Sequence, residues 1–267
     1  MAITTLDGAL AGMAPPTYFA KAASGTLVAG RPFSPFYTAG VPGAAVAPSP
    51  GLAGAALTSY SGQLPIPAAS NNTHLARFTG VSSAQGGHLL LCDRLWHNSG
   101  ITITQNTAQN INSVTWPARD RSGTTNGNGV LIGVEVSAAT GAGTPTLTIG
   151  YTDSAGNSGA TATNVDATVA NSAIGTFYRI GLAAGGVGVR SIQTLTLSAT
   201  WTSGTIHLVA YRVLAAVELA AAGLPNAVDA LTSGMPRMYD NTVPFLIYVP
   251  QTTTTTLLSG QLACTQG

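Results

Sequence analysis

The middle of the chain is a series of short apolar or alternating segments separated by turns. Threonine alternates with apolar residues over residues 144–151, and apolar and polar residues alternate again over residues 191–198. A period of two is typical of a strand that buries one face. Continuous apolar runs, which we interpret as buried strands, lie at residues 88–96, 130–136 and 206–214. The intervening segments are rich in Gly, Asn, Asp and Ser, which favour tight turns.

The spacing leaves no room for long helices between these strands, so consecutive strands are expected to run antiparallel. We therefore predict an all-β fold: an antiparallel β-sandwich or jelly roll with an extended N-terminal arm and one or two short helices. Residues 87–219 form the predicted sandwich body.

The two ends of the chain follow other patterns. Leu6, Leu10 and Met13 have helical spacing, and the two prolines that follow would end such a helix. The rest of residues 1–86 is rich in Ala, Gly and Pro and predicts an extended arm with a few aromatic anchors. Residues 220–267 predict a short helix near 224–231 and two strands that return to complete the sandwich.

Composition changes the picture of the surface. Only 19 of the 267 residues are charged, the net charge is +1, and Lys21 is the single lysine. About a quarter of the residues are charged in an ordinary soluble domain. So little charge gives almost no repulsion between molecules, so a free monomer would be poorly soluble. We infer that other proteins cover much of the surface and that the chain is part of an assembly.

Candidate catalytic and binding groups are few. Cys92 and His97 lie five positions apart in a predicted strand, which directs them to opposite faces and favours a core strand over a Cys–His nucleophile pair. The histidines lack metal-ligand spacing, and the ten basic residues form no stripe for nucleic acid. We therefore expect no catalytic residue, cofactor, metal, direct nucleic-acid contact or membrane span. Cys92 and Cys264 are expected as buried thiols, with a disulfide between them left open.

The residues predicted to contact a partner are aromatic and arginine side chains in two segments. In the arm they are Arg31, Phe33, Phe36 and Tyr37. In the body they are Arg119 and Arg121, because the forked guanidinium group suits interfaces. The alternative for the second pair is a solvated loop with a local salt bridge.

Four segments of the chain resemble poorly characterised virion structural proteins of tailed bacteriophages. They are residues 6–16, 91–100, 117–127 and 234–240. The resemblance covers most of the chain and supplies no catalytic residues. It implies a virion component assembled in the cytoplasm of the host bacterium.

These observations together lead us to expect a non-enzymatic capsid decoration or cement (minor capsid) protein. It would bind the major capsid protein or other virion proteins, and also sister copies, as a trimer. One alternative is a neck, tail or fibre-attachment protein of the virion. Another is a surface glycan-binding β-domain, which requires an exposed tryptophan that stacks on sugars.

Overall fold

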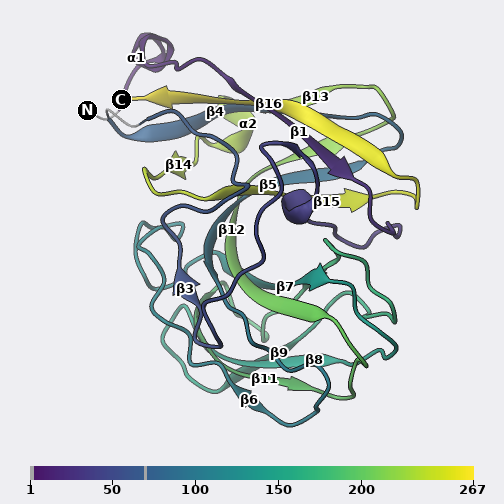
Figure 1. The fold of residues 1–267 in the computed structure, drawn as a ribbon. Helices are drawn as coiled ribbons and strands as arrows, with labels where there is room; N and C mark the ends of the chain where they lie inside the picture. Colours follow the sequence, from purple (N-terminus) through teal and green to yellow (C-terminus); the bar gives the residue numbers. More distant parts are fainter. Residues whose placement is uncertain (1–2, 69–70) are drawn as a thin grey trace. The chain divides into compact units, whose positions relative to one another are not determined.

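Antiparallel sheets make up almost all of the regular structure in the computed structural model, which describes residues 3–68 and 71–267 (Figure 1). The described residues include two short α-helices, α1 (Leu6–Ala11) and α2 (Ala230–Ser233). The predicted all-β fold is confirmed. The chain divides into two units: unit 1 consists of Met1–Ala45, Ser59–Asp93 and Val213–Gly267, and unit 2 of Val46–Thr58 and Arg94–Arg212.

Unit 2 is a sandwich of two sheets around one apolar core. One sheet has the order β6 (Gln109–Asn110), β11 (Val189–Leu197), β8 (Leu147–Asp153) and β9 (Ala160–Thr163). The other sheet contains β10 (Phe177–Arg179), β7 (Val130–Ala138), and the unit 2 parts of β12 (Thr205–Leu219) and β5 (Gly87–His97), in that order, and β3 (Ala55–Ala56) pairs with β5. All three tryptophans of the chain lie in the core of this unit.

Unit 1 is built on a sheet in which the last strand of the chain is central. Its order is β13 (Asn226–Asp229), β4 (Thr73–Ser82), β16 (Thr256–Gln266), β1 (Thr17–Ala23) and β2 (Gly40–Val41). The two-residue strand β14 (Arg237–Met238) also pairs with β4. Strand β15 (Pro244–Pro250) pairs with the unit 1 part of β5, and its side chains join those of the larger sheet in a second apolar core.

The strands of the predicted body are found close to their expected positions. Alternation and apolar runs correctly located β5, β7, β8, β11 and β12, and the helix predicted from Leu6 and Leu10 is α1, with Thr5 as its N-cap. The second helix is shorter than predicted. Residues 226–229 form β13, α2 follows, and Gly234 ends it with a φ of 68° that glycine adopts without strain.

The predicted boundaries of the arm and body need correction. Strands β1 and β4 both lie within residues 1–86, yet they flank β16 in the sheet of unit 1. The segment between these two strands is extended, with only the two-residue strands β2 and β3 and the short 3-10 helix Pro35–Tyr37 in its described residues. The body likewise does not end at residue 219, because residues 213–219 belong to unit 1.

Candidate functional site

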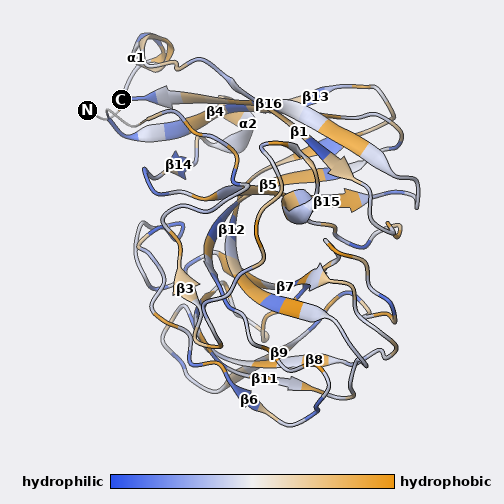
Figure 2. Cartoon of the chain, in the orientation of Figure 1, coloured by the Kyte–Doolittle hydropathy of each residue, from blue (hydrophilic) through white to orange (hydrophobic). Residues whose placement is uncertain are grey.

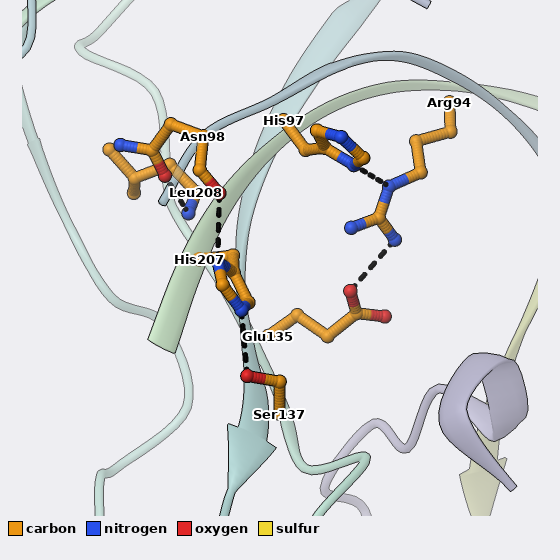
Figure 3. A network of polar contacts seen from close by, with 7 residues as sticks. All are labelled: Arg94, His97, Asn98, Glu135, Ser137, His207 and Leu208. Atoms are coloured by element: carbon orange, nitrogen blue, oxygen red, sulfur yellow. Dashed lines mark hydrogen bonds and ion pairs between the residues drawn. The ribbon is translucent and has the colours of Figure 1, made fainter. Parts of the chain in front are cut away.

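Polar side chains on or next to β5, β7 and β12 contact one another within unit 2 (Figure 3). Strands β7 and β12 are buried on both faces over most of their length, so a charged residue in either must find its partner inside the protein. Figure 2 shows that the hydrophobic course of β12 is interrupted by hydrophilic residues. We call the following set the polar network: Arg94, His97, Asn98, Glu135, Ser137 and His207.

The network contains an ion pair with no exposed surface. Arg94 Nη1 lies 2.7 Å from Glu135 Oε2, and both side chains are fully buried. Arg94 is on β5 and Glu135 on β7, with β12 between them, so the pair spans a strand. The second carboxylate oxygen, Oε1, has no hydrogen-bond partner among the described residues. Removing either partner would leave a buried uncompensated charge, which is strongly destabilising.

The hydrogen-bond partners of both histidines identify the neutral tautomers. Arg94 Nε donates to His97 Nδ1 at 3.3 Å, so this nitrogen is the acceptor and carries no proton. His207 Nδ1 lies 2.8 Å from the Asn98 carbonyl oxygen and must donate to it; in the neutral ring, Nε2 then accepts from the Ser137 hydroxyl at 2.6 Å.

Burial reinforces this assignment. Burial, together with the nearby Arg94 and His207, lowers the pKa of His97 to about 2. Burial also lowers the pKa of His207, and the Asn98 carbonyl opposes that effect. Because Arg94 already pairs with Glu135, a proton on either buried ring would add a second positive charge to the cluster, which burial opposes.

The polar network connects strands and is not placed to meet a substrate. Its two histidines and its ion pair are all 2% exposed or less. Asn98 additionally accepts from the Leu208 backbone N–H at 2.8 Å, which joins the end of β5 to β12. Among the described residues, no group of three or more His, Cys, Asp or Glu side chains is arranged to hold a metal ion. Cys92 and Cys264 are free and buried.

The aromatic residues predicted to contact a partner are held within unit 1. Phe33 exchanges backbone hydrogen bonds with Tyr248 of β15, at 2.7 and 2.8 Å, and its ring is buried. Phe36 is also buried and packs edge-on against Phe245, with ring centroids 5.9 Å apart. The prediction was wrong for these two residues because their partners are in the same chain. Tyr37 and Arg31 are half-buried.

The two predicted arginine contacts differ from each other. Arg119 is buried and donates to the Leu57 carbonyl at 2.7 Å and the Arg94 carbonyl at 3.2 Å, so its predicted role as a contact was wrong. Arg121 is exposed and stays a candidate. The glycan-binding alternative also loses its basis, since every tryptophan of the chain is at most 2% exposed.

A second candidate site is an apolar groove on the surface of unit 1. It has a volume of about 620 Å³. We call the following lining residues the apolar face: Leu6, Leu10, Met13 and Leu231, with Arg77 and Asp229 as its charged members. The three leucines are 75%, 61% and 93% exposed, so within residues 3–68 and 71–267 nothing covers them.

The sequence contained a signal for part of the polar network that the strand prediction did not use. Glu135 and His207 each interrupt an otherwise apolar run, and in a strand buried on both faces such residues must be paired. The apolar face carried no comparable signal, because Leu231 is distant in sequence from Leu6 and Leu10 and meets them only through the sheet of unit 1.

Comparisons with known proteins do not assign the chain to a family. No family model matches it, and no curated protein is similar to it in sequence. Among solved structures, the infectious bursal disease virus VP2 subviral particle aligns with a TM-score of 0.17 and 11% identity, over 96% of this chain and 82% of that one. A TM-score this low carries no argument about fold or function. No helix among the described residues is long and apolar enough to cross a membrane.

Proposed function

We propose that this chain is a non-enzymatic structural component of a tailed-phage virion, and specifically a capsid decoration or cement protein. The observation that carries the proposal is the scarcity of charge on the surface. Seven of the 19 charged residues are buried and five are half-buried. Only seven are exposed: Asp7, Arg77, Arg121, Arg190, Glu218, Asp229 and Asp240.

Covering such a surface with another protein costs little desolvation free energy. Charged groups resist burial because they lose their hydration, and the centres of protein interfaces are depleted in them. Apolar surface, in contrast, gains about 25 cal/mol for each Å² removed from water. An interface of roughly 1,600 Å² over this surface would therefore lose little to desolvation.

The resemblance of residues 6–16, 91–100, 117–127 and 234–240 to virion proteins of tailed phages supports the same proposal. A neck, tail or fibre-attachment position would use the same surface chemistry, and what separates the positions is copy number. Decoration requires hundreds of copies in each particle, whereas a neck or fibre position requires a few or a few tens.

The test is a mass-spectrometric count of this chain in purified particles of the phage that encodes it, relative to the major capsid protein. For decoration, we expect a copy number close to that of the major capsid protein. A ratio of about one to a few per hundred would move the chain to the neck or tail. Absence from purified particles would overturn the virion role altogether.

A further inference from the structure

Helix α1 of unit 1 presents apolar side chains that none of the described residues covers. Helix α1 has only six residues, and none of them is buried. Leu6 and Leu10 lie four positions apart, so both project from the same side of the helix, where they line the groove. A helix this short is marginal by itself, and packing is what normally stabilises it. Figure 1 shows α1 beside the C-terminal end of β16, at the margin of its sheet.

In the described part of unit 1, α1 and the residues just after it are attached to β16 by hydrogen bonds and a strand bridge. Thr265 Oγ1 donates to the Ala9 carbonyl at 2.5 Å, and the Gln266 N–H donates to the Gly12 carbonyl at 2.9 Å. Met13 forms an isolated bridge with Thr265. Helix α1 is therefore fixed to β16, while the side that carries its two leucines stays exposed.

The opposite side of the groove also presents an exposed leucine, Leu231. Asp229 caps α2 by accepting from the backbone N–H groups of Leu231 and Thr232, both at 3.0 Å. This cap fixes Leu231 as a projecting side chain that is 93% exposed. One face thus combines a hollow of about 620 Å³ with leucines that project beside it.

The charges of the apolar face are of both signs and are adjacent. Arg77 of β4 and Asp229 of β13 are direct partners in the strand register, and both are exposed. A surface with one positive and one negative group side by side is complementary to its own copy turned by a two-fold axis, since each group then meets its opposite. An anionic membrane would instead require a basic excess.

We propose that the apolar face binds the same face of a second copy, with the projecting leucines of each copy entering the groove of the other and Arg77 of one facing Asp229 of the other. The contact extends the proposed function, because it supplies the link between sister copies. It commits the face to a two-fold pair, so any larger ring of copies would have to form through another surface.

Sedimentation velocity of the full chain over a concentration series tests the proposal, with Leu231→Asp as the main variant. This side chain is almost fully exposed, so the variant should fold as the wild type does, and circular dichroism checks that. We expect the wild type to dimerise and Leu231→Asp to weaken dimerisation by about tenfold or more. Leu224→Asp is the matched control, because Leu224 is 53% exposed and lies outside the groove.

Arg77→Glu provides an independent second variant. It places like charges opposite each other in the two-fold pair and should also weaken the dimer, more strongly at low salt. A wild type that stays monomeric, or a Leu231→Asp variant that dimerises like the wild type, would overturn the proposal. The copy number in particles separates the pairing from the virion role. If the chain is present in particles but monomeric in solution, only the proposed pairing is refuted. If the chain dimerises but is absent from particles, only the virion role is refuted.

Discussion

Acidification should destabilise unit 2, because His97 is buried there as a neutral ring. Its Nδ1 accepts a hydrogen bond from Arg94, so a proton on that nitrogen would break the bond and place two positive charges together. Burial, with Arg94 and His207, lowers the pKa of His97 from 6.5 to about 2. The unfolded chain takes up this proton near pH 6.5, so between these two values unfolding binds a proton. The free energy of unfolding therefore falls as the pH falls through that window.

The expected size of the effect follows from the two pKa values. Going from about pH 7 to about pH 5 crosses roughly 1.5 pH units below 6.5, and each unit is worth about 1.4 kcal/mol. His97 alone should then lower the free energy of unfolding by about 2 kcal/mol. The pKa of His207 is also lowered, mainly by burial, so this ring adds a loss of the same sign.

Urea unfolding followed by tryptophan fluorescence at the two pH values measures this loss, because all three tryptophans report on the core of unit 2. In the variant His97→Asn, the amide oxygen can still accept from Arg94 but does not titrate. The variant should lose about 2 kcal/mol less than the wild type between pH 7 and pH 5. His88→Asn, at an exposed histidine, is the matched control. An identical pH-dependent loss in His97→Asn and the wild type would refute the assignment.

Three further changes test other parts of the structure. Arg94→Met leaves Glu135 buried without its ion-pair partner and should lower the free energy of unfolding, measured with urea, by about 3–5 kcal/mol. Adding Glu135→Leu should recover most of that loss, and a double variant no more stable than the single one would contradict this. Gly133→Ala would place a methyl group 2.0 Å from a phenylalanine ring and should cost about 1–3 kcal/mol, while Gly43→Ala points into open space and should leave the Tm unchanged. Lys21 is buried and donates to three backbone carbonyls, so an amine-reactive reagent should modify it only after urea unfolds the chain, as peptide mass spectrometry would show.

The strands that sequence reasoning located are those whose side chains alternate or are uniformly apolar, and the strands that it missed depart from both patterns. Strand β4 contains a bulge opposite Ala263 and Cys264, so its inward residues Leu75 and Phe78 are three positions apart rather than two. Strand β1 buries Lys21 and Ala23 beside Phe19. Lysine and alanine are both disfavoured in strands, so local preference argued against this one.

The candidate sites depended on contacts between residues far apart in the chain. Charged residues inside apolar runs indicate that a buried partner exists, but Arg94 and Glu135 are identified as partners only when β12 is known to lie between their strands. The aromatic residues of the N-terminal segment posed the opposite difficulty. Phe33 and Phe36 are equally suited to a foreign surface and to their own core, and the choice is made by the position of β15.

The central position of β16 orders the events of synthesis on the ribosome. Every segment of unit 2 has been translated once residue 212 is made, whereas the sheet of unit 1 lacks the strand that joins β1 to β4 until residues 256–266 emerge. Phe19 of β1 and Phe78 of β4 stack on each other in the finished protein. Until β16 is made, no strand lies between β1 and β4 to pair with both. A stop codon shortly before residue 256 should therefore yield a product in which unit 1 exposes its apolar side chains and is quickly degraded, although the missing segment is only a small fraction of the length.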